Sequence, residues 1–396
     1  MASFQLTRSF KAFFESERAG GLVLLTCTVL SMLVANSSWG ESYLHFWHST
    51  LDASFSFIKL NYSVEHWVND GLMAIFFLLV GLEIERELYA GELKEIKNAM
   101  LPIAAAIGGM VVPAAIHFLF NRNTATSHGF GIPMATDIAF ALGMLSLLGN
   151  RVPASLKIFL TALAIIDDLG AILIIAIFYN TGISWLYLGL ALGIFIVLII
   201  LNRLKVYHLA FYLIPGVVMW YCMLQSGVHA TITGVLLAFA IPFTAKDANE
   251  TNGPSYKLQH WLHKPVAFII LPIFAMANTG IPLMNQWYTH LSSNNSLGII
   301  LGLFLGKTIG ILLFCWLLIK FNWGRLPDGS QWKHLLGTGI LAGIGFTMSI
   351  FIANLAFKDQ TVIQDSKIAV LAGSLLSCLV GLFVLWCCTK SSKIIK

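Results

Sequence analysis

Residues 155–179 read SLKIFLTALAIIDDLGAILIIAIFY, with two adjacent carboxylic acids in the middle of a largely apolar run. The run has about the length that an α-helix needs to cross the hydrocarbon core of a bilayer, roughly 20 residues. An ionisable side chain at mid-membrane costs at least about 2.5 kcal/mol on insertion scales. Asp167 and Asp168 are therefore expected to be functional residues in a membrane-spanning helix.

Apolar runs of similar length recur along the whole chain. Of its 396 residues 57% are hydrophobic and 11% are charged, whereas soluble domains carry roughly 25% charged residues. So few charges cannot cover a water-exposed surface of this size. The pattern predicts an all-α, polytopic membrane protein, a single domain over residues 1–396 with about twelve transmembrane helices at residues 20–36, 67–84, 100–120, 125–148, 155–179, 183–201, 209–224, 227–243, 265–284, 297–319, 335–357 and 368–388.

Lys and Arg give the predicted orientation, because in short loops they stay on the cytoplasmic side. With the N-terminus inside, nineteen of the 24 fall in inside segments and four in outside loops, and Lys307 lies within a segment. Both termini are therefore expected to be cytoplasmic, with the first apolar run a signal-anchor helix rather than a cleaved signal peptide. The net charge of +5 reflects this topology and indicates no nucleic-acid partner. The six cysteines lack metal-site spacing, and no cofactor is expected.

The longest outside connection, residues 39–66, contains the alternating stretch Ser54–Leu60, SFSFIKL. Alternation of this kind predicts a short β-hairpin on the membrane surface between the first and second helices. Its free edge could join two protomers. A hairpin folded onto its own protein fits the residues equally well.

The predicted segments 3–5 and 10–12 run in opposite directions through the bilayer, the arrangement of an inverted-topology repeat. The middle segment of each triplet has poor helical continuity. Its interrupting residues are Gly129, Gly131 and Pro133 in segment four, and Gly337, Gly339, Gly343 and Gly345 in segment eleven. Such breaks are tolerated at membrane depth only where the freed backbone groups face protein or a wet cavity. Two broken, crossing helices are therefore expected, with Thr347 just after the second break.

Four ionisable residues lie well inside the predicted segments: Asp137, Asp167, Asp168 and Lys307. Asp167 and Lys307 are roughly 15–20 Å from the segment ends, so they can meet. Asp137 follows the first break, where it faces the positive end of a half-helix dipole, while Thr136 caps freed amides or offers an oxygen to an ion. Lys307 is expected to complement negative half-helix ends or to pair with Asp167. The alternative is a permanent ion-pair network that only holds the bundle together.

Asp167 and Asp168 point about 100° apart on one helix, so both can line one cavity. Two carboxylates close together in a low dielectric cannot both ionise easily, and at least one is expected to hold a proton near neutral pH. Sodium also prefers oxygen ligands. Protons and sodium then compete for the same oxygens. This predicts a secondary transporter that exchanges Na⁺ for H⁺, and not an enzyme.

Two other functions also use buried charges. An intramembrane aspartyl protease needs two carboxyls face to face from separate helices, and neighbours on one helix point apart; Asp137 with Asp167 leaves this alternative open. A transporter that carries an organic anion with sodium needs cation or amide groups to recognise the anion, for which Lys307 alone is thin support.

Five stretches of the sequence are specific: Phe76–Glu83 (FFLLVGLE), Ala135–Gly143 (ATDIAFALG), Ala162–Ala171 (ALAIIDDLGA), Ser226–Thr231 (SGVHAT) and Gly343–Phe351 (GIGFTMSIF). On these stretches, and over Gly20 to Leu385, the chain resembles the NhaA-type sodium/proton antiporters of bacterial inner membranes. The resemblance implies that Asp167 and Asp168 carry the exchanged Na⁺, and Li⁺, and the protons. It also implies that Asp137 and Lys307 balance the dipoles of the broken helices, with Thr136 near the ion.

The resemblance further implies electrogenic exchange with more than one H⁺ per Na⁺, activation at alkaline pH, and a homodimer joined through the outside hairpin around Ser54–Leu60. Its pH-responsive cluster would be Glu83, Arg86, Glu87, His260 and His263. Two residues depart from the family pattern, because Gln259 stands where some relatives have a glutamate and Glu85 where they have a basic residue. His229, like His260 and His263, can titrate between about pH 5 and 8 and is a further candidate for pH response.

Overall fold

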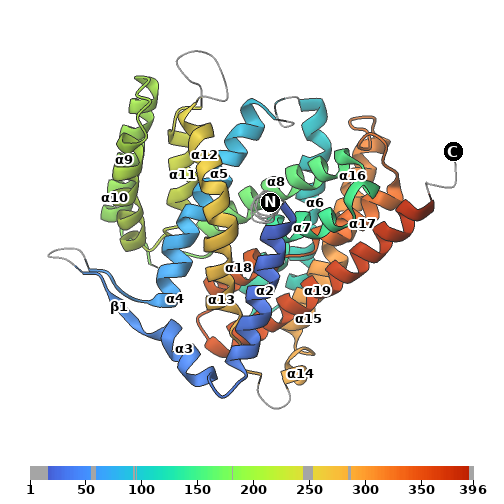
Figure 1. The fold of residues 1–396 in the computed structure, drawn as a ribbon, viewed down its shortest axis with the longest axis horizontal. Coiled ribbons are helices and arrows are strands. Elements are labelled where there is room, and N and C mark those ends of the chain that lie inside the picture. The colour runs from blue at the N-terminus through green and yellow to red at the C-terminus, as the bar shows by residue number, and fades with distance from the viewer. Residues whose placement is uncertain are drawn as a thin grey trace, which may run out of the picture. The chain divides into compact units, whose positions relative to one another are not determined.

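A computed structural model describes residues 17–54, 59–91, 94, 96–180, 182–243, 253–283 and 287–391. Within these ranges the chain is folded almost entirely into helices (Figure 1). The only sheet in the described ranges has two strands. Helices satisfy their backbone hydrogen bonds within the segment, which a membrane interior requires. The predicted all-α membrane fold is confirmed.

Eight helices in the described part of the chain are long and apolar enough to cross a membrane: Val64–Tyr89, Ala99–Phe120, Ser127–Leu147, Ala154–Phe178, Trp185–Arg203, Pro254–Thr279, Asn294–Lys320 and Gln360–Cys388. Two further helix pairs are bent at a short break, Ala19–Ala35 with Gly40–His48 by 113° and Trp332–Ala342 with Phe346–Ala356 by 44°. If each bent pair is one span, there are up to 10.

The remaining two expected segments are shorter helices. Helix α10 (Ala210–Ser226) has 17 residues and α11 (Ile232–Ala240) has 9. At 1.5 Å per residue α11 is about 14 Å long, roughly half of a 30 Å hydrocarbon core. Segment eight was therefore predicted in the right place but too long, because hydropathy does not distinguish a helix from the apolar turns at its ends.

The chain divides into two compact units. The first contains residues 1–26, 95–171 and 283–396, and the second contains residues 27–94 and 172–282. Helices α2 (Glu17–Ala35) and α8 (Ala154–Phe178) continue from one unit into the other. Both interrupted segments of the predicted repeats belong to the first unit.

Besides most of α8, the first unit holds α6 (Ile96–Phe120), the 3-10 helix η3 (Ser127–Met134), α7 (Ile138–Leu147), η4 (Gly149–Arg151), α14 (Trp287–His290), α15 (Asn294–Leu301), the π-helical turn η7 (Gly302–Gly306), α16 (Lys307–Lys320), α17 (Trp332–Ala342), α18 (Phe346–Ala356) and α19 (Gln360–Ser391). Non-helical residues separate η3 from α7 at 135–137 and α17 from α18 at 343–345. Each break lies between two long helices, α6 and α8 in one case, α16 and α19 in the other. This is the order that the predicted repeat requires.

Two glycines allow α6 and α16 to approach closely. A Cβ on Gly108 would clash with the Gly310 carbonyl oxygen, and a Cβ on Gly310 would clash with the Gly108 carbonyl oxygen. Small residues have this role in membranes, where close packing rather than burial from water drives helix association. The contact places α16, which begins at Lys307, against α6.

The second unit holds α3 (Gly40–His48), β1 (Thr50–Asp52), β2 (Asn61–Ser63), α4 (Val64–His66), η1 (Trp67–Leu72), α5 (Met73–Tyr89), α9 (Trp185–Arg203), α10, α11, α12 (Pro254–Pro265), η6 (Val266–Ile270) and α13 (Leu271–Thr279). Helix α9 packs beside α10, and α5 packs beside α11 (Figure 1). A Cβ on Gly234 of α11 would clash with the Ala74 carbonyl oxygen, so the second contact also depends on glycine.

The expected hairpin is present, but its strands flank the predicted stretch. β1 and β2 pair antiparallel, between α3 and α4 in the chain. The Ser54 amide donates to Asp52 Oδ1 at 2.9 Å, and the Leu60 amide donates to the Ser54 hydroxyl at 2.9 Å. These side chains compete with the strand ladder for backbone groups and turn the chain. Of the predicted stretch, Ser54, Lys59 and Leu60 therefore lie between the two strands, and residues 55–58 lie outside the described residues.

Candidate functional site

Asp167 and Asp168 lie near the middle of α8, a helix of 25 residues. Their exposed fractions are 0% and 1%. Asp167 is about 20 Å from the start of the helix at 1.5 Å per residue, deep within a core of roughly 30 Å. The sequence therefore placed both carboxyls correctly in the protein interior.

Lys307 is the first residue of α16 and follows the π-helical turn η7. Such turns distort a helix and recur at functional sites. The Lys307 side chain is fully buried, and its Nζ lies 2.8 Å from Asp167 Oδ2. Nζ also donates to the carbonyl oxygen of Met134, the last residue of η3. The sequence offered two partners for Lys307, a carboxylate and a negative half-helix end, and the structure contains both.

Thr136 joins Asp167 to the second broken segment. Its Oγ1 lies 2.8 Å from Asp167 Oδ2 and 2.9 Å from the carbonyl oxygen of Ala342, the last residue of α17. A hydroxyl has one proton to donate, so at any moment it serves one of these acceptors. When Asp167 is ionised, the proton satisfies the carboxylate. When Asp167 is protonated, its own proton can go to Thr136, and the hydroxyl proton is free for Ala342.

Asp137 caps two helix N-termini at once. It is the N-cap of α7, and its Oδ1 accepts from the Phe140 amide at 2.9 Å. Its Oδ2 accepts from the Thr347 amide at 3.1 Å and from the Thr347 hydroxyl, in the first turn of α18. The positive ends of two half-helices therefore converge on one carboxylate, which stabilises its charge. The sequence placed Asp137 at the first of these ends and did not indicate the second.

The two breaks are in direct contact. The Asp137 amide donates to the Ile344 carbonyl at 2.7 Å, and the Ser349 hydroxyl donates to the Ile132 carbonyl at 2.6 Å. These bonds supply partners for backbone groups that the interrupted helices leave without an intrahelical one. The predicted crossing of the broken helices is confirmed.

Glycine is required in the second break because backbone and hydroxyl groups approach it closely. A Cβ on Gly343 would clash with the Leu303 carbonyl oxygen, and a Cβ on Gly345 would lie 3.1 Å from the Ala135 carbonyl oxygen and clash with the Ser349 hydroxyl. Larger residues at either position would push the two segments apart.

Gly131 and Pro133 were predicted at the first break but lie in the helix before it. Both are buried within η3, and the first break itself is at residues 135–137. Proline has no amide proton and cannot continue a hydrogen-bond ladder. The 3-10 helix nevertheless includes Pro133 and ends one residue later at Met134, whose carbonyl accepts a hydrogen bond from the Lys307 ammonium.

Five groups at the crossing were not predicted: the carbonyls of Ile132, Ala342 and Ile344 and the hydroxyls of Ser349 and Ser374. Ser374 lies on α19 and accepts from the Phe346 amide, in the first turn of α18, at 3.1 Å. Main-chain carbonyls leave no trace in a sequence. The serines had one weak signal, since hydroxyl residues near glycine breaks can replace lost backbone partners.

The charges at the crossing do not balance. Three carboxyls, Asp137, Asp167 and Asp168, and one ammonium, Lys307, are all at most 2% exposed. If all four ionise, two negative charges remain among them. Each buried ion carries an effective penalty of several kcal/mol unless it is paired and hydrogen-bonded. Asp167 Oδ1 has no hydrogen-bond partner in the part of the chain that the structure describes. The group therefore favours a state with further positive charge bound, as protons or as a metal cation.

The candidates for pH response lie in the second unit and make weak contacts. Glu83 Oε1 is 3.9 Å from His263 Nδ1, and these side chains are 17% and 63% exposed. Arg86 pairs with the adjacent Glu87 at 2.9 Å, and His260 is exposed. Partly exposed pairs of this kind are worth roughly 0–1 kcal/mol. These two ion pairs therefore contribute little to stability.

Glu85 and Gln259, for which the resemblance implied a departure from the family pattern, are buried near this cluster. Glu85 is 4% and Gln259 is 7% exposed. Glu85 Oε2 accepts a hydrogen bond of 2.6 Å from the Ser255 hydroxyl at the start of α12. His229 lies apart from them, with its Nε2 2.8 Å from the Tyr179 carbonyl oxygen.

Two interrupted helices that cross beside buried carboxyls in a multi-pass membrane protein define a secondary transporter by their architecture. The chain belongs to the Na⁺/H⁺ antiporter 1 family, which matches residues 11–385. It is 58% identical to the Na⁺/H⁺ antiporter NhaA of Flavobacterium psychrophilum over 381 residues, 96% of each chain. It is 57% identical to NhaA 1 of Flavobacterium johnsoniae over 377 residues, 95% of this chain and 96% of the relative. It is 46% identical to NhaA of Citrobacter koseri over 387 residues, 97% and 98% of the two chains. The resemblance inferred from the five sequence stretches is confirmed.

Proposed function

We propose that this protein is an electrogenic antiporter that exports Na⁺, and also Li⁺, in exchange for more than one H⁺. Asp167 and Asp168 are the ion and proton site, and Asp137, Thr136 and Lys307 support it. The observation that carries the proposal is the excess of buried carboxyls over ammonium groups at the helix crossing. The names of the relatives, all Na⁺/H⁺ antiporters, favour ion exchange over proteolysis or organic-anion transport.

Exchange follows from competition for carboxyl oxygens. A bare pair of buried carboxylates is costly, so the site holds either protons or a cation. Na⁺ displaces protons when it binds, and protons displace Na⁺ on the other side of the membrane. The empty, fully ionised site is the state of highest energy, and its cost suppresses the uncoupled movement of either ion.

The supporting residues allow the charge at Asp167 to change without breaking the crossing. Asp137 stays bound to two helix N-termini, and Lys307 stays bound to the Met134 carbonyl. Thr136 turns its single proton between Asp167 and Ala342 as the carboxyl gains or loses its own. With more than one H⁺ per Na⁺, net positive charge moves inward, and the membrane potential contributes roughly 2.3 kcal/mol per charge per 100 mV.

We propose that Glu83, Arg86, Glu87, His260 and His263, with His229, adjust activity to pH. The weak, partly exposed contacts of this cluster support a regulatory role rather than a structural one. Glu85 is a buried carboxyl that relatives with a basic residue there lack, so the activating pH of this protein is expected to differ from theirs.

The placement in the cell is also part of the proposal. The Lys and Arg distribution supports a bacterial inner membrane protein with both termini in the cytoplasm, acting in sodium and pH homeostasis. The β1–β2 hairpin, whose first strand is exposed throughout, is proposed as the contact of a homodimer.

The experiment is a proteoliposome assay of proton movement against Na⁺, Li⁺ and K⁺, with and without a clamped membrane potential. We expect exchange with Na⁺ and Li⁺ but not K⁺. Because net positive charge moves with the protons, proton entry should be faster when the vesicle interior is negative, and proton exit faster when it is positive. Where one proton competes for the site, the apparent KM for Na⁺ should fall about tenfold per unit rise in pH. A KM that does not change with pH, or equal rates with K⁺, would contradict the proposal.

A further inference from the structure

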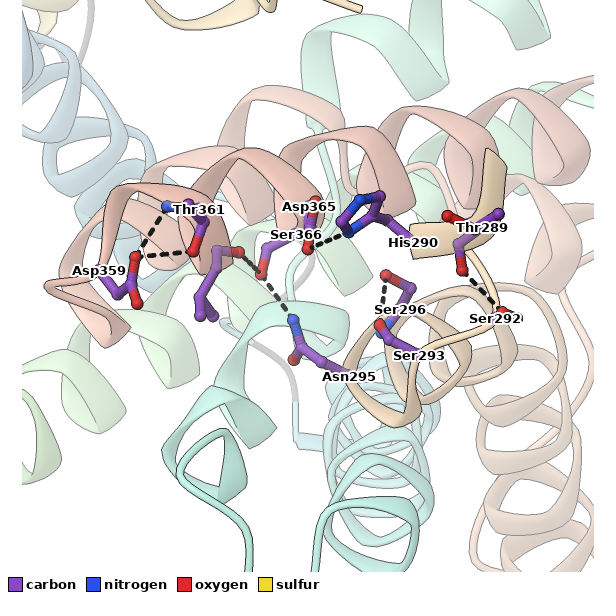
Figure 2. Close-up of polar contacts among 11 residues, drawn as sticks. Thr289, His290, Ser292, Ser293, Asn295, Ser296, Asp359, Thr361, Asp365 and Ser366 are labelled. Atoms are coloured by element: carbon purple, nitrogen blue, oxygen red, sulfur yellow. Dashed lines mark hydrogen bonds and ion pairs between the residues drawn. The ribbon is translucent and has the colours of Figure 1, made fainter. Parts of the chain in front are cut away.

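His117 occupies a buried position that the ion site does not explain. It lies in the last turn of α6 and is fully buried. Its Nε2 is 3.1 Å from Asn295 Oδ1, at the start of α15, and Asn295 Nδ2 donates to the Ser366 hydroxyl of α19 at 2.8 Å. Figure 2 shows the Asn295 amide directed at Ser366, with the more exposed His290–Asp365 pair beside it. One polar chain therefore connects α6, α15 and α19.

The hydrogen bonds fix the direction of this chain. Ser366 donates its one proton to the Val362 carbonyl at 2.7 Å, so its oxygen must accept from the Asn295 amino group. Asn295 then presents its carbonyl oxygen to the imidazole. His117 then carries a proton on Nε2 and donates it to Asn295, so the longer approach of Asn121 Nδ2 to the same nitrogen, at 3.4 Å, cannot also be a hydrogen bond. A neutral histidine with this tautomer serves Asn295, while its buried Nδ1 has no hydrogen-bond partner in the part of the chain that the structure describes.

The same imidazole also contacts a third element. A Cβ on Gly129 of η3 would lie 3.1 Å from His117 Cε1, and a Cβ on Gly298 of α15 would lie 3.0 Å from His117 Cδ2. The ring therefore lies close to the backbone of both η3 and α15, beside Phe357 Cζ and Asn121 Nδ2, which are the atoms nearest to these two positions, at 2.6 and 2.8 Å. Asn121 makes a second connection between the same two elements. It donates to the Asn294 carbonyl of α15 at 3.1 Å and accepts from the hydroxyl of Thr126, just before η3, at 2.7 Å.

The two elements held by this ring carry the partners of the ion site. η3 ends at Met134, whose carbonyl accepts from Lys307. The continuous span α15–η7–α16 runs from Asn295 to Lys307, about 18 Å at 1.5 Å per residue. The position of η3 along this span decides whether Lys307 can reach the Met134 carbonyl and Asp167 together.

We propose that His117 is a positioning residue for cation binding. Through Asn295, Gly129 and Gly298 it sets the register between η3 and the α15–η7–α16 span, and so holds Lys307 against Met134 and Asp167. This inference rests on the proposed ion site, and it adds a residue that touches none of the carboxyls' hydrogen-bond partners described above to the determinants of Na⁺ affinity.

The test compares His117→Phe, which keeps a ring but removes the donor, with His117→Gln, which keeps a donor. His290→Phe, which breaks the neighbouring exposed pair, is the matched control. The readout is the rise in Tm of purified protein on adding Na⁺, which reports binding without transport. We expect His117→Phe to weaken Na⁺ binding roughly five- to tenfold, about the effect of one buried hydrogen bond. His117→Gln and His290→Phe should stay within about twofold of the unmodified protein.

A double-mutant cycle separates positioning from general stability. In a Lys307→Met background, His117→Phe should have no further effect on Na⁺ binding, because the contact that it positions is already gone. An equal effect in both backgrounds, or a lower Tm with unchanged Na⁺ affinity, would overturn the inference. If His117→Phe does not fold, Ser366→Ala, which releases the Asn295 amide, should weaken binding roughly two- to fivefold.

The Asp167→Asn protein distinguishes this inference from the proposed function. If Asp167→Asn loses the Na⁺ response and His117→Phe keeps it, the ion site is supported and the positioning role of His117 is wrong. A full Na⁺ response in Asp167→Asn contradicts the ion site itself, and with it the positioning role.

Discussion

Asp167→Asn and Asp168→Asn are each expected to abolish Na⁺-driven dissipation of a pH gradient in vesicles, with at least about a hundredfold loss of rate, or roughly 2.8 kcal/mol. An amide has nearly the shape of the carboxyl but neither ionises nor supplies negative charge to a cation. Both side chains are at most 1% exposed, so bulk water cannot stabilise a cation that has lost its carboxylate partner. The penalty of holding a cation without its counter-charge in such a place is several kcal/mol, more than enough for this loss.

The control for this prediction is Asp359→Asn. Asp359 lies in the connection before α19, where the Thr361 hydroxyl and amide, each hydrogen-bonded to its carboxylate, hold its pKa below the usual range. Its carboxylate is hydrogen-bonded to Thr361 in the first turn of α19, and exchange should be unchanged. Substantial exchange in both the Asp167 and Asp168 variants would show that these carboxyls do not carry the ion.

Lys307→Met is expected to destabilise the protein by about 3–5 kcal/mol, the cost of breaking one side of a buried ion pair. The Tm should fall by roughly 5 °C or more. Asp167 loses the ammonium at 2.8 Å, and the Met134 carbonyl loses its donor. The loss should be larger at high pH than at low pH, because a proton on Asp167 removes the uncompensated charge. The double variant Lys307→Met/Asp167→Asn should recover most of the stability.

Lys320→Met is the matched control on the same helix. Lys320 ends α16, is exposed, and has its ammonium 4.7 Å from the centre of the Trp316 ring. Its removal should change the Tm by less than about 2 °C, since an exposed cation–π contact is worth roughly 0.5–1 kcal/mol. A Lys307→Met protein as stable as the control would mean that the buried pair is not what holds the crossing together.

Charge and hydropathy predicted most of the site. The burial of Asp167, Asp168 and Lys307 follows from their places within apolar runs, and the ion pair follows from their similar depth. The position of Asp137 beside a break indicated its cap on α7. These predictions succeed because a charge in a membrane has few stable environments, and each of them is associated with a pattern that can be recognised in the sequence.

The rest of the site depends on contacts between distant segments. The second cap that Asp137 makes, on α18, joins residues 210 positions apart. The Ile132, Ala342 and Ile344 carbonyls are main-chain groups with no residue signature. In the sequence His117 is one histidine near a helix end, and its contact with Asn295, 178 positions away, is visible only in the structure. The hairpin strands were displaced for a similar reason, because Asp52 and Ser54 turn the chain before the alternating stretch can pair.

Direct measurement of proton release tests the central claim, that Na⁺ and H⁺ compete for the same buried carboxyl oxygens. Purified protein in weakly buffered detergent solution receives NaCl at constant pH, and choline chloride serves as the control. We expect Na⁺ alone to release protons, and the Asp167→Asn/Asp168→Asn protein to release none. Binding of Na⁺, seen as a rise in Tm, without any release of protons would contradict the account.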